Sequence, residues 1–143
     1  MNDATNGSAH DPAHLSLLVH PEHLAVVRLG AGADVPSWAT SATVFSVTAT
    51  AEETSLVCAA AGVPRKARSQ GPFVAFSVVG PLDFALTGVL AGLLAPLSEA
   101  GISVFTLSTF DTDWILVPAD RAGDAAEEWR RRGHQVDPAP TPS

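Results

Sequence analysis

The chain has 143 residues, 46% of them hydrophobic, which suffices for one ordinary domain or two very small ones with a buried core. Eight Lys and Arg against 15 Asp and Glu give a formal charge of −7, so no nucleic-acid partner is expected. Charged residues, Gly or Pro interrupt every apolar run, and the N-terminus lacks the pattern of a secretion signal. We therefore expect a cytoplasmic protein without a membrane partner. Its single cysteine, Cys58, leaves no internal disulfide.

The beginning of the chain predicts a tail and then a hairpin. Positions 1–14 are polar and aperiodic, which indicates a disordered tail. Two apolar runs, 15–19 and 24–29, flank a His-Pro-Glu-His segment at 20–23. Because four such residues are enough for a tight turn, the two runs are predicted to pair as a β-hairpin.

A strand and a helix are expected next. Residues 44–48 are typical of a strand, and Thr50 followed by Glu53 matches a helix capping box. Small apolar residues behind the box predict a helix that closes at 62–64 and carries Cys58, as a buried inert thiol, on its inner side. Its predicted apolar face consists of Leu56, Val57, Ala60 and Ala61.

The middle of the chain predicts a strand, a loop and a helix. The strand is 73–79, apolar at nearly every position, and Gly80-Pro81 ends it. Thr87 can cap the following helix, Gly101 can end it, and Pro96 predicts a kink or a weakened last turn. One face of that helix carries Leu86, Val89, Leu90, Leu93, Leu94 and Leu97 at intervals of three and four.

A second hairpin follows the helix. The runs 102–109 and 114–117 are separated by Phe110-Asp111-Thr112-Asp113, an Asp-rich turn. A right-handed crossover would make 73–79 and 102–109 parallel and place both loops at one end of the sheet. The helix N-terminus favours an anion and the Asp-rich turn a cation, so a zwitterion such as a free amino acid suits both.

The last elements are a helix and an edge strand. Asp120 is a plausible N-cap, Gly133 a stop signal, and 134–136 a short edge strand. The Pro-rich residues 138–143 are expected to form a disordered tail. The inner stripe of this helix is predicted to be Ala122, Ala125, Ala126 and Trp129.

The run from Gly80 to Pro118 resembles ACT domains of the CASTOR-like, aspartate-kinase-related group. The motifs that carry this resemblance are Thr87-Gly88-Val89-Leu90, Glu99-Ala100-Gly101-Ile102-Ser103 and Ser108-Thr109-Phe110-Asp111-Thr112-Asp113. The resemblance implies an α+β fold with a ferredoxin-like βαββαβ ACT unit at 73–137. Residues 15–62 would be a degenerate ACT-like half, with 63–72 as linker. The two halves could form two small sheets or one joined sheet, with the helices on one side.

The resemblance also implies a ligand site. In this group, the loop before the first helix, the start of that helix and the Ser-Thr-Phe-x-x-Asp turn hold a small amino acid. Carried over by motif, the expected ligand-binding residues are Asp83, Thr87, Gly88, Val89, Thr109, Phe110 and Asp113. No cofactor or metal is expected, since His20 and His23 have no evident third ligand.

Two functions from different classes remain open. One is an amino-acid-binding regulatory sensor, working as a homodimer or through intrachain ACT pairing. The other is a ligand-free dimerisation or scaffold module that binds a protein partner, in which case the Asp-rich turn and the loop before the helix are ordinary connections. An enzyme is not expected, because no nucleophile elbow, phosphate-binding loop or paired metal-binding motif occurs.

Overall fold

In the computed structural model, residues 14–83 and 87–140 are described. Most of the two expected tails, and Leu86 of the predicted helix face, therefore lie outside the described residues. The elements in chain order are β1 (Ser16–Gly30), β2 (Ser46–Ala49), β3 (Glu53–Ala59), η1 (Ala60–Gly62), β4 (Arg68–Val78), α1 (Val89–Glu99), β5 (Phe105–Ser108), β6 (Asp113–Pro118), η2 (Ala119–Arg121), α2 (Ala122–Arg131) and β7 (Gln135–Pro138).

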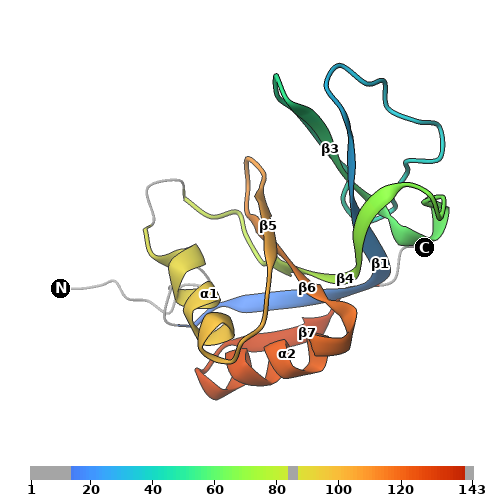
Figure 1. Ribbon diagram of the computed structural model, residues 1–143. Helices are drawn as coiled ribbons and strands as arrows, with labels where there is room; N and C mark the ends of the chain where they lie inside the picture. Colours follow the sequence, from blue (N-terminus) through green and yellow to red (C-terminus); the bar gives the residue numbers. More distant parts are fainter. Residues whose placement is uncertain (1–13, 84–86, 141–143) are drawn as a thin grey trace.

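All the strands belong to one seven-stranded sheet (Figure 1). Its order is β2-β3-β1-β4-β6-β5, and β7 pairs with β1. Along one edge of β1, the first half pairs with β7 in parallel and the second half with β3 in antiparallel orientation; β4 pairs along the other edge. The two parts of the chain therefore form one joined sheet, with β1 and β4 running through both.

The ACT-like part has the expected chain order β4-α1-β5-β6-α2-β7. Because β4 and β5 are both antiparallel to β6, they are parallel to each other, as predicted, with β6 between them. The first half of β1 is inserted between β4 and β7. This α+β arrangement is the expected ferredoxin-like βαββαβ unit with one additional strand from the N-terminal part.

The predicted hairpin at 15–29 is wrong, because both apolar runs belong to the single strand β1. Val19 pairs with Phe76, and the next pair in the register joins His23 to Val74, so residues 20–22 of β1 have one residue opposite them. Extra residues on one strand form a bulge, which bends the strand. Pro21 lies in this irregular stretch, where it need not donate a ladder hydrogen bond.

The predicted helix after Thr50 is also wrong, since residues 53–59 form strand β3. The Thr50 hydroxyl does accept hydrogen bonds from the backbone N–H groups of Glu52 and Glu53, both at 3.1 Å, but it does so in the turn between β2 and β3. A threonine can stabilise either kind of turn. Cys58 is buried, as expected, but on a strand, and burial raises the pKa of its thiol.

The segment expected to be a linker, 63–72, overlaps the sheet, since β4 begins at Arg68. Its first residues pair with β1, with Arg68 opposite Arg28 and Gln70 opposite Val26. The N-terminal part, which contains η1 but no α-helix within residues 15–62, therefore has no sheet of its own.

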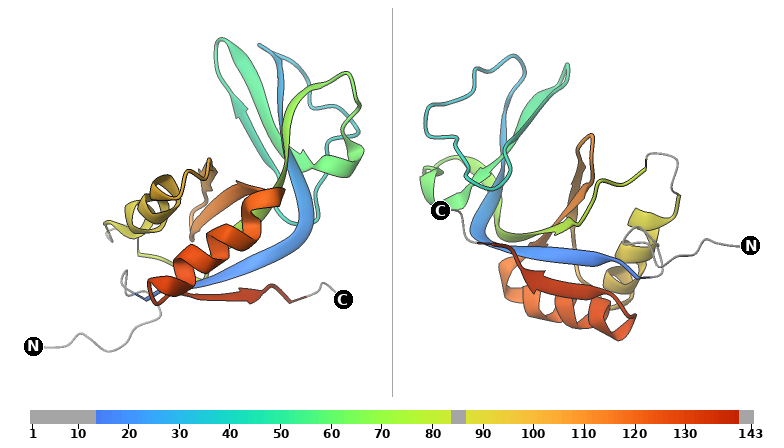
Figure 2. Two further views of the ribbon diagram at one scale, coloured as in Figure 1. Left: turned by 60° about the horizontal axis from the view of Figure 1, so that its bottom comes forward. Right: turned by 180° about the vertical axis from the view of Figure 1, so that it is seen from behind.

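The two α-helices lie on one face of the sheet (Figure 2). Helix α1 begins after Gly88 (φ 82°), and no side chain of the described residues caps it, so the predicted Thr87 cap is wrong. It continues past Pro96 to Glu99 and is followed by Gly101 (φ 73°), the predicted stop. Helix α2 buries the predicted Ala125, Ala126 and Trp129; Arg121 rather than Asp120 precedes it. Neither helix is long and apolar enough to span a membrane.

Alternation along the strands divides the interior into two faces. Val74, Phe76 and Val78 of β4 face the helices, while Phe73 and Ala75 contribute to a second cluster on the other face. A third cluster joins β1 and β3 to the connecting segments around Trp38 and Val63. Strand β4 is thus covered on both faces, which explains its nearly continuous apolar sequence.

Trp129 is the largest fully buried side chain of the helix layer. Its indole Nε1 donates to the Leu93 carbonyl at 2.8 Å, and its ring meets Phe76 edge-on at a centroid distance of 4.9 Å. Trp129→Phe should lower the free energy of unfolding by about 2–4 kcal/mol, because it leaves a cavity and an unpaired buried carbonyl. Urea denaturation measures the loss. Trp114→Phe, at a partly exposed position, should lower the free energy of unfolding by less. An equal loss in both variants would contradict the proposed importance of the buried Trp129 indole.

Glu22 fixes the connection between β1 and β2. Its Oε1 accepts hydrogen bonds from the Ser41 hydroxyl at 2.9 Å and from the backbone N–H groups of Thr43 at 3.0 Å and Ala42 at 3.2 Å. Burial alone would raise the pKa of Glu22, but the hydrogen bonds from Thr43, Ser41 and Ala42 together lower it.

A lowered folded-state pKa means that Glu22 stabilises the protein above the ordinary glutamate pKa of about 4.3, and that this contribution is lost as the pH falls through the lowered value. Glu22→Gln should therefore be less stable than the wild type at pH 7, and the difference should shrink in strongly acidic solution. Urea denaturation at a series of pH values measures it. Glu127→Gln, at an exposed position, is the matched control; a pH-independent difference for Glu22→Gln would rule out the charge effect.

Candidate functional site

Two hydrogen bonds join the loop after β4 to the turn between β5 and β6. The Leu82 N–H donates to the Asp111 carbonyl at 2.7 Å, and the Thr112 hydroxyl donates to the Val78 carbonyl at 2.6 Å. Since β4 and β5 are parallel, the chain leaves both at the same end of the sheet. The structure thus confirms that the two predicted loops lie together.

The turn itself is closed by Thr109 and Thr112. The Thr109 N–H donates to the Thr112 carbonyl at 2.8 Å, and the Thr109 hydroxyl accepts from the Thr112 N–H at 3.3 Å. Gly80 lies directly against this turn, where a Cβ atom would come within 3.0 Å of the Asp111 carbonyl oxygen. The Leu82 backbone nitrogen would be equally near, so a larger residue here would require the loop and the turn to move apart by a few tenths of an ångström.

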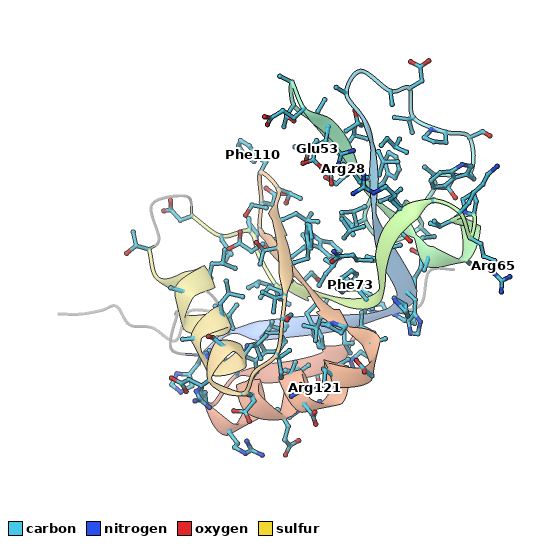
Figure 3. The ribbon with its side chains drawn as sticks, viewed as in Figure 1. Arg28, Glu53, Arg65, Phe73, Phe110 and Arg121 are labelled. Atoms are coloured by element: carbon cyan, nitrogen blue, oxygen red, sulfur yellow. The ribbon has the colours of Figure 1, made fainter. Side chains whose placement is uncertain are left out.

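A cavity of about 230 Å³ lies between the loop, the turn and the start of α1. Three of the predicted residues, Thr109, Phe110 and Asp113, line it from the turn side, and Asp83 and Val89 from the other; Thr87 and Gly88 directly precede Val89 but do not line it. Phe110 stands at the tip of the hairpin (Figure 3), fully exposed, so its ring is not packed against a neighbour. Among the described residues, the lining consists of Leu82, Asp83, Val89, Ser108, Thr109, Phe110, Asp111, Thr112 and Asp113.

The sequence reasoning did not select four of these lining residues. Asp111 and Thr112 belong to the predicted turn motif, so their place inside that motif could have identified them as lining residues. Leu82 lies in the predicted loop, and Ser108 precedes the predicted residue Thr109. Ser108 has a specific role, because its hydroxyl donates to Asp113 Oδ1 at 2.6 Å and orients this carboxylate.

The charge of the cavity is uneven. Three carboxylates, those of Asp83, Asp111 and Asp113, line it, and its lining contains no Lys or Arg. On the side of Val89, α1 begins without a side-chain cap from the described residues, and the first N–H groups of a helix have no partner within it. A helix N-terminus attracts negative charge, whereas the carboxylates attract positive charge. The arrangement is thus suited to a small ligand that carries both charges.

Metal binding has no support in the described part of the chain. No group of three or more His, Cys, Asp or Glu side chains is close enough there to hold an ion. His20 instead contacts Ser77, at 2.8 Å between Nε2 and Oγ, and packs against Trp114 with a ring distance of 4.8 Å. Its role is therefore explained by packing, and burial lowers its pKa.

Known proteins resemble this chain in both sequence and structure. A family model described as ACT domain matches residues 68–127, and a model for an N-terminal domain matches residues 22–66. The human cytosolic arginine sensor for mTORC1 subunit 1 is 42% identical over 52 residues. These residues make up 36% of this chain and 16% of the sensor, so the matched region spans about a sixth of that relative.

Two crystal structures show the similarity over most of the fold. A protein from Agobacterium tumefaciens has a TM-score of 0.81 at 30% identity, covering 91% of this chain and 98% of that one. The regulatory subunit of aspartate kinase from Thermus flavus has a TM-score of 0.58 at 11% identity, covering 81% of this chain and 95% of that subunit. At this low identity the second similarity concerns the fold alone.

The Thr112 hydrogen bond provides a test of how the loop and the turn are held together. Thr112→Val keeps the side-chain shape but removes the donor to the Val78 carbonyl, which should cost about 0.5–1.5 kcal/mol of unfolding free energy. Backbone hydrogen exchange at residues 80–83 and 109–113 should become faster. Thr106→Val, at an exposed position on β5, is the control. Unchanged exchange in Thr112→Val would show that this bond does not hold the loop.

Proposed function

Because this chain belongs to the ACT-domain family, we propose that it is a regulatory module that binds a free amino acid between the loop after β4 and the β5–β6 turn. The observation that carries the proposal is the cavity of about 230 Å³ lined from both of these segments. Small-molecule pockets generally hold drug-sized ligands in about 300–1,000 Å³, so a smaller volume suits a single amino acid.

The ligand's two charged groups have distinct partners in the proposed complex. Its carboxylate accepts hydrogen bonds from backbone N–H groups at the start of α1, where the helix dipole is positive: Val89 lines the cavity, and Thr87 and Gly88 directly precede it outside the lining. Its ammonium group or a basic side chain meets Asp113, which Ser108 already orients. Asp111 adds negative charge on the same turn, and Asp83 adds it from the loop after β4.

Arginine is the first candidate ligand. The turn alone brings two carboxylates, those of Asp111 and Asp113, to one small cavity, so an ammonium group can pair with one and a guanidinium group with the other. The human relative that is 42% identical over 52 residues is, by its name, an arginine sensor.

Regulation follows if the ligand prefers one arrangement of the loop. A ligand that contacts the loop and the turn at once favours the state in which they lie together, and shifts the population by its difference in affinity. The response would reach a partner surface through the β5–β6 hairpin or through a second copy of the chain.

A dimerisation or scaffold module is the second candidate function. Strand β5 lies at the edge of the sheet, and the exposed aromatic rings of Phe105 and Phe110 belong to its hairpin. Exposed aromatic side chains beside an open edge are typical of contact surfaces. In this case the protein would form a dimer that no amino acid affects.

Thermal unfolding with each proteinogenic amino acid at millimolar concentration distinguishes the two functions. A ligand at a hundred times its dissociation constant stabilises the fold by about 2.7 kcal/mol. For a domain of this size the midpoint should rise by roughly 5 to 11 °C. We expect such a rise with one amino acid, arginine first.

Variants then locate the site. Asp113→Asn keeps the shape that Ser108 contacts but removes the charge, and should weaken binding about tenfold or more, because a charged hydrogen bond contributes about 1.5–3 kcal/mol. Asp34→Asn, at an exposed position in the β1–β2 connection, should bind like the wild type. An affinity of Asp113→Asn within twofold of wild type would refute the assigned site, and no rise with any amino acid would favour the scaffold.

A further inference from the structure

A second cavity, of about 380 Å³, lies between the face of the β1–β3–β4 part of the sheet and strand β5. We refer to it as the arginine cleft. Figure 3 shows Arg28 and Glu53 side by side here, projecting from β1 and β3. The cleft is lined by Val26, Val27, Arg28, Glu53, Ser55, Arg68, Ser69, Gln70 and Phe105.

Two arginines lie opposite each other in this cleft. The sheet register pairs Arg28 of β1 with Arg68 of β4, and on its other side with Ser55 of β3. Residues directly opposite in antiparallel strands project from the same face, with Cβ atoms about 4.5–5.5 Å apart. Like charges in such a pair destabilise the sheet, so this register places positive charge where an anion would relieve repulsion.

The two guanidinium groups are unequally partnered. Arg28 donates to the Glu52 carbonyl at 3.2 Å, and its Nε lies 4.0 Å from Glu53 Oε1. Within the described part of the chain, the Arg68 guanidinium makes neither a hydrogen bond nor an ion pair. One guanidinium is therefore available for a ligand, and the other is held in place beside it.

The charge of the cleft is opposite to that of the whole protein. The chain has only eight Lys and Arg and a formal charge of −7, yet the ionisable side chains lining the cleft are two arginines and one glutamate. Gln70 pairs with Val26, which lies two residues from Arg28, so its amide is on the same face of the sheet as the two arginines. Ser55, opposite Arg28, adds a hydroxyl there. These groups donate hydrogen bonds to carboxylate or phosphate oxygens.

The other wall of the cleft is aromatic. Phe105 of β5 is 38% exposed, and its ring lies 6.3 Å from that of Phe73, tilted by 56°. Val26 continues the apolar surface toward the arginines. The volume of the cleft lies within the usual range of small-molecule pockets. Its positive end beside an aromatic wall selects a ligand with an anionic group and a flat apolar part.

We infer that the arginine cleft is a second small-molecule site, which takes an organic anion whose carboxylate or phosphate bridges Arg28 and Arg68 while its ring packs on Phe105. The site is separate from the proposed amino-acid site and does not depend on it. The two cavities nevertheless share β5, which begins at Phe105 in the cleft and ends at Ser108 in the first cavity.

Benzoate and phenyl phosphate are suitable probes, with benzyl alcohol as the neutral analogue, all titrated into the full chain at constant ionic strength. Calorimetry should show saturable binding of at least one anion and none of benzyl alcohol. The two anions separate a carboxylate site from a phosphate site. In two-dimensional NMR spectra of the wild type, the backbone amides of Ser55 and Gln70 should shift with the same saturation.

Arg68→Gln should weaken anion binding at least tenfold, while its melting temperature without ligand should equal or exceed that of the wild type, because a like-charge pair is removed. Arg65→Gln is the control for net charge, since Arg65 is exposed and lies away from Arg28 (Figure 3). Phe105→Leu should weaken the binding of benzoate and phenyl phosphate but leave the binding of inorganic phosphate unchanged.

The Asp113→Asn variant separates the two proposals, since it should retain anion binding in the arginine cleft even if the amino-acid site is absent. The inference is overturned if neither anion saturates the wild type. It is also overturned if Arg68→Gln binds as the wild type does, or if Arg65→Gln loses as much affinity as Arg68→Gln. The inference is equally refuted if the backbone amide signals that shift on anion titration all belong to residues outside the cleft.

Discussion

The hydrogen bonding of β1 is the constraint on which the rest of this structure depends. Its first half lies between β7 and β4, and its second half between β3 and β4, so one 15-residue strand holds both parts of the chain in one sheet. The bulge around Pro21 lets the strand bend without losing its partners. The helices then cover one face of the ACT-like part, whereas the N-terminal part is covered by connecting segments that Glu22 helps to hold.

The candidate amino-acid site is a consequence of this topology. Parallel β4 and β5 bring the loop at Leu82 and the turn at Thr112 to the same end of the sheet, and backbone contacts then hold them together. The turn carboxylates of Asp111 and Asp113 and, across the cavity, the start of α1, which no side chain of the described residues caps, supply opposite charges. The arginine cleft arises from a different part of the same sheet, where the register places two like charges opposite each other.

The spacing of residues predicted the structure correctly where a single helix accounts for that spacing without partners from elsewhere in the chain. The stop at Gly101 and the inner face of α2 with Trp129 are determined by backbone conformation and helical spacing, and the structure confirms them. It also confirms the α1 stripe from Val89 onward, whereas Leu86 lies outside the described residues. Five of the seven predicted site residues line one cavity, because their motif included both segments that meet there. The ligand assignment of these residues stays a prediction. Thr50 shows the limit of such reasoning, since its hydroxyl pairs with the same backbone groups in a hairpin turn as in a helix cap.

The sequence by itself determined the type of fold in the second half, the position of its two loops and the acidic character of the candidate site. Only the tertiary structure decided that 15–29 is one bent strand rather than a hairpin, that 53–59 is a strand rather than a helix, and that the expected linker joins the sheet at Arg68. The physical reason is that strand pairing is non-local. A helix satisfies its backbone hydrogen bonds within its own segment, whereas β1 obtains its partners from β3, β4 and β7, and the register of those partners is not written in any short stretch of sequence.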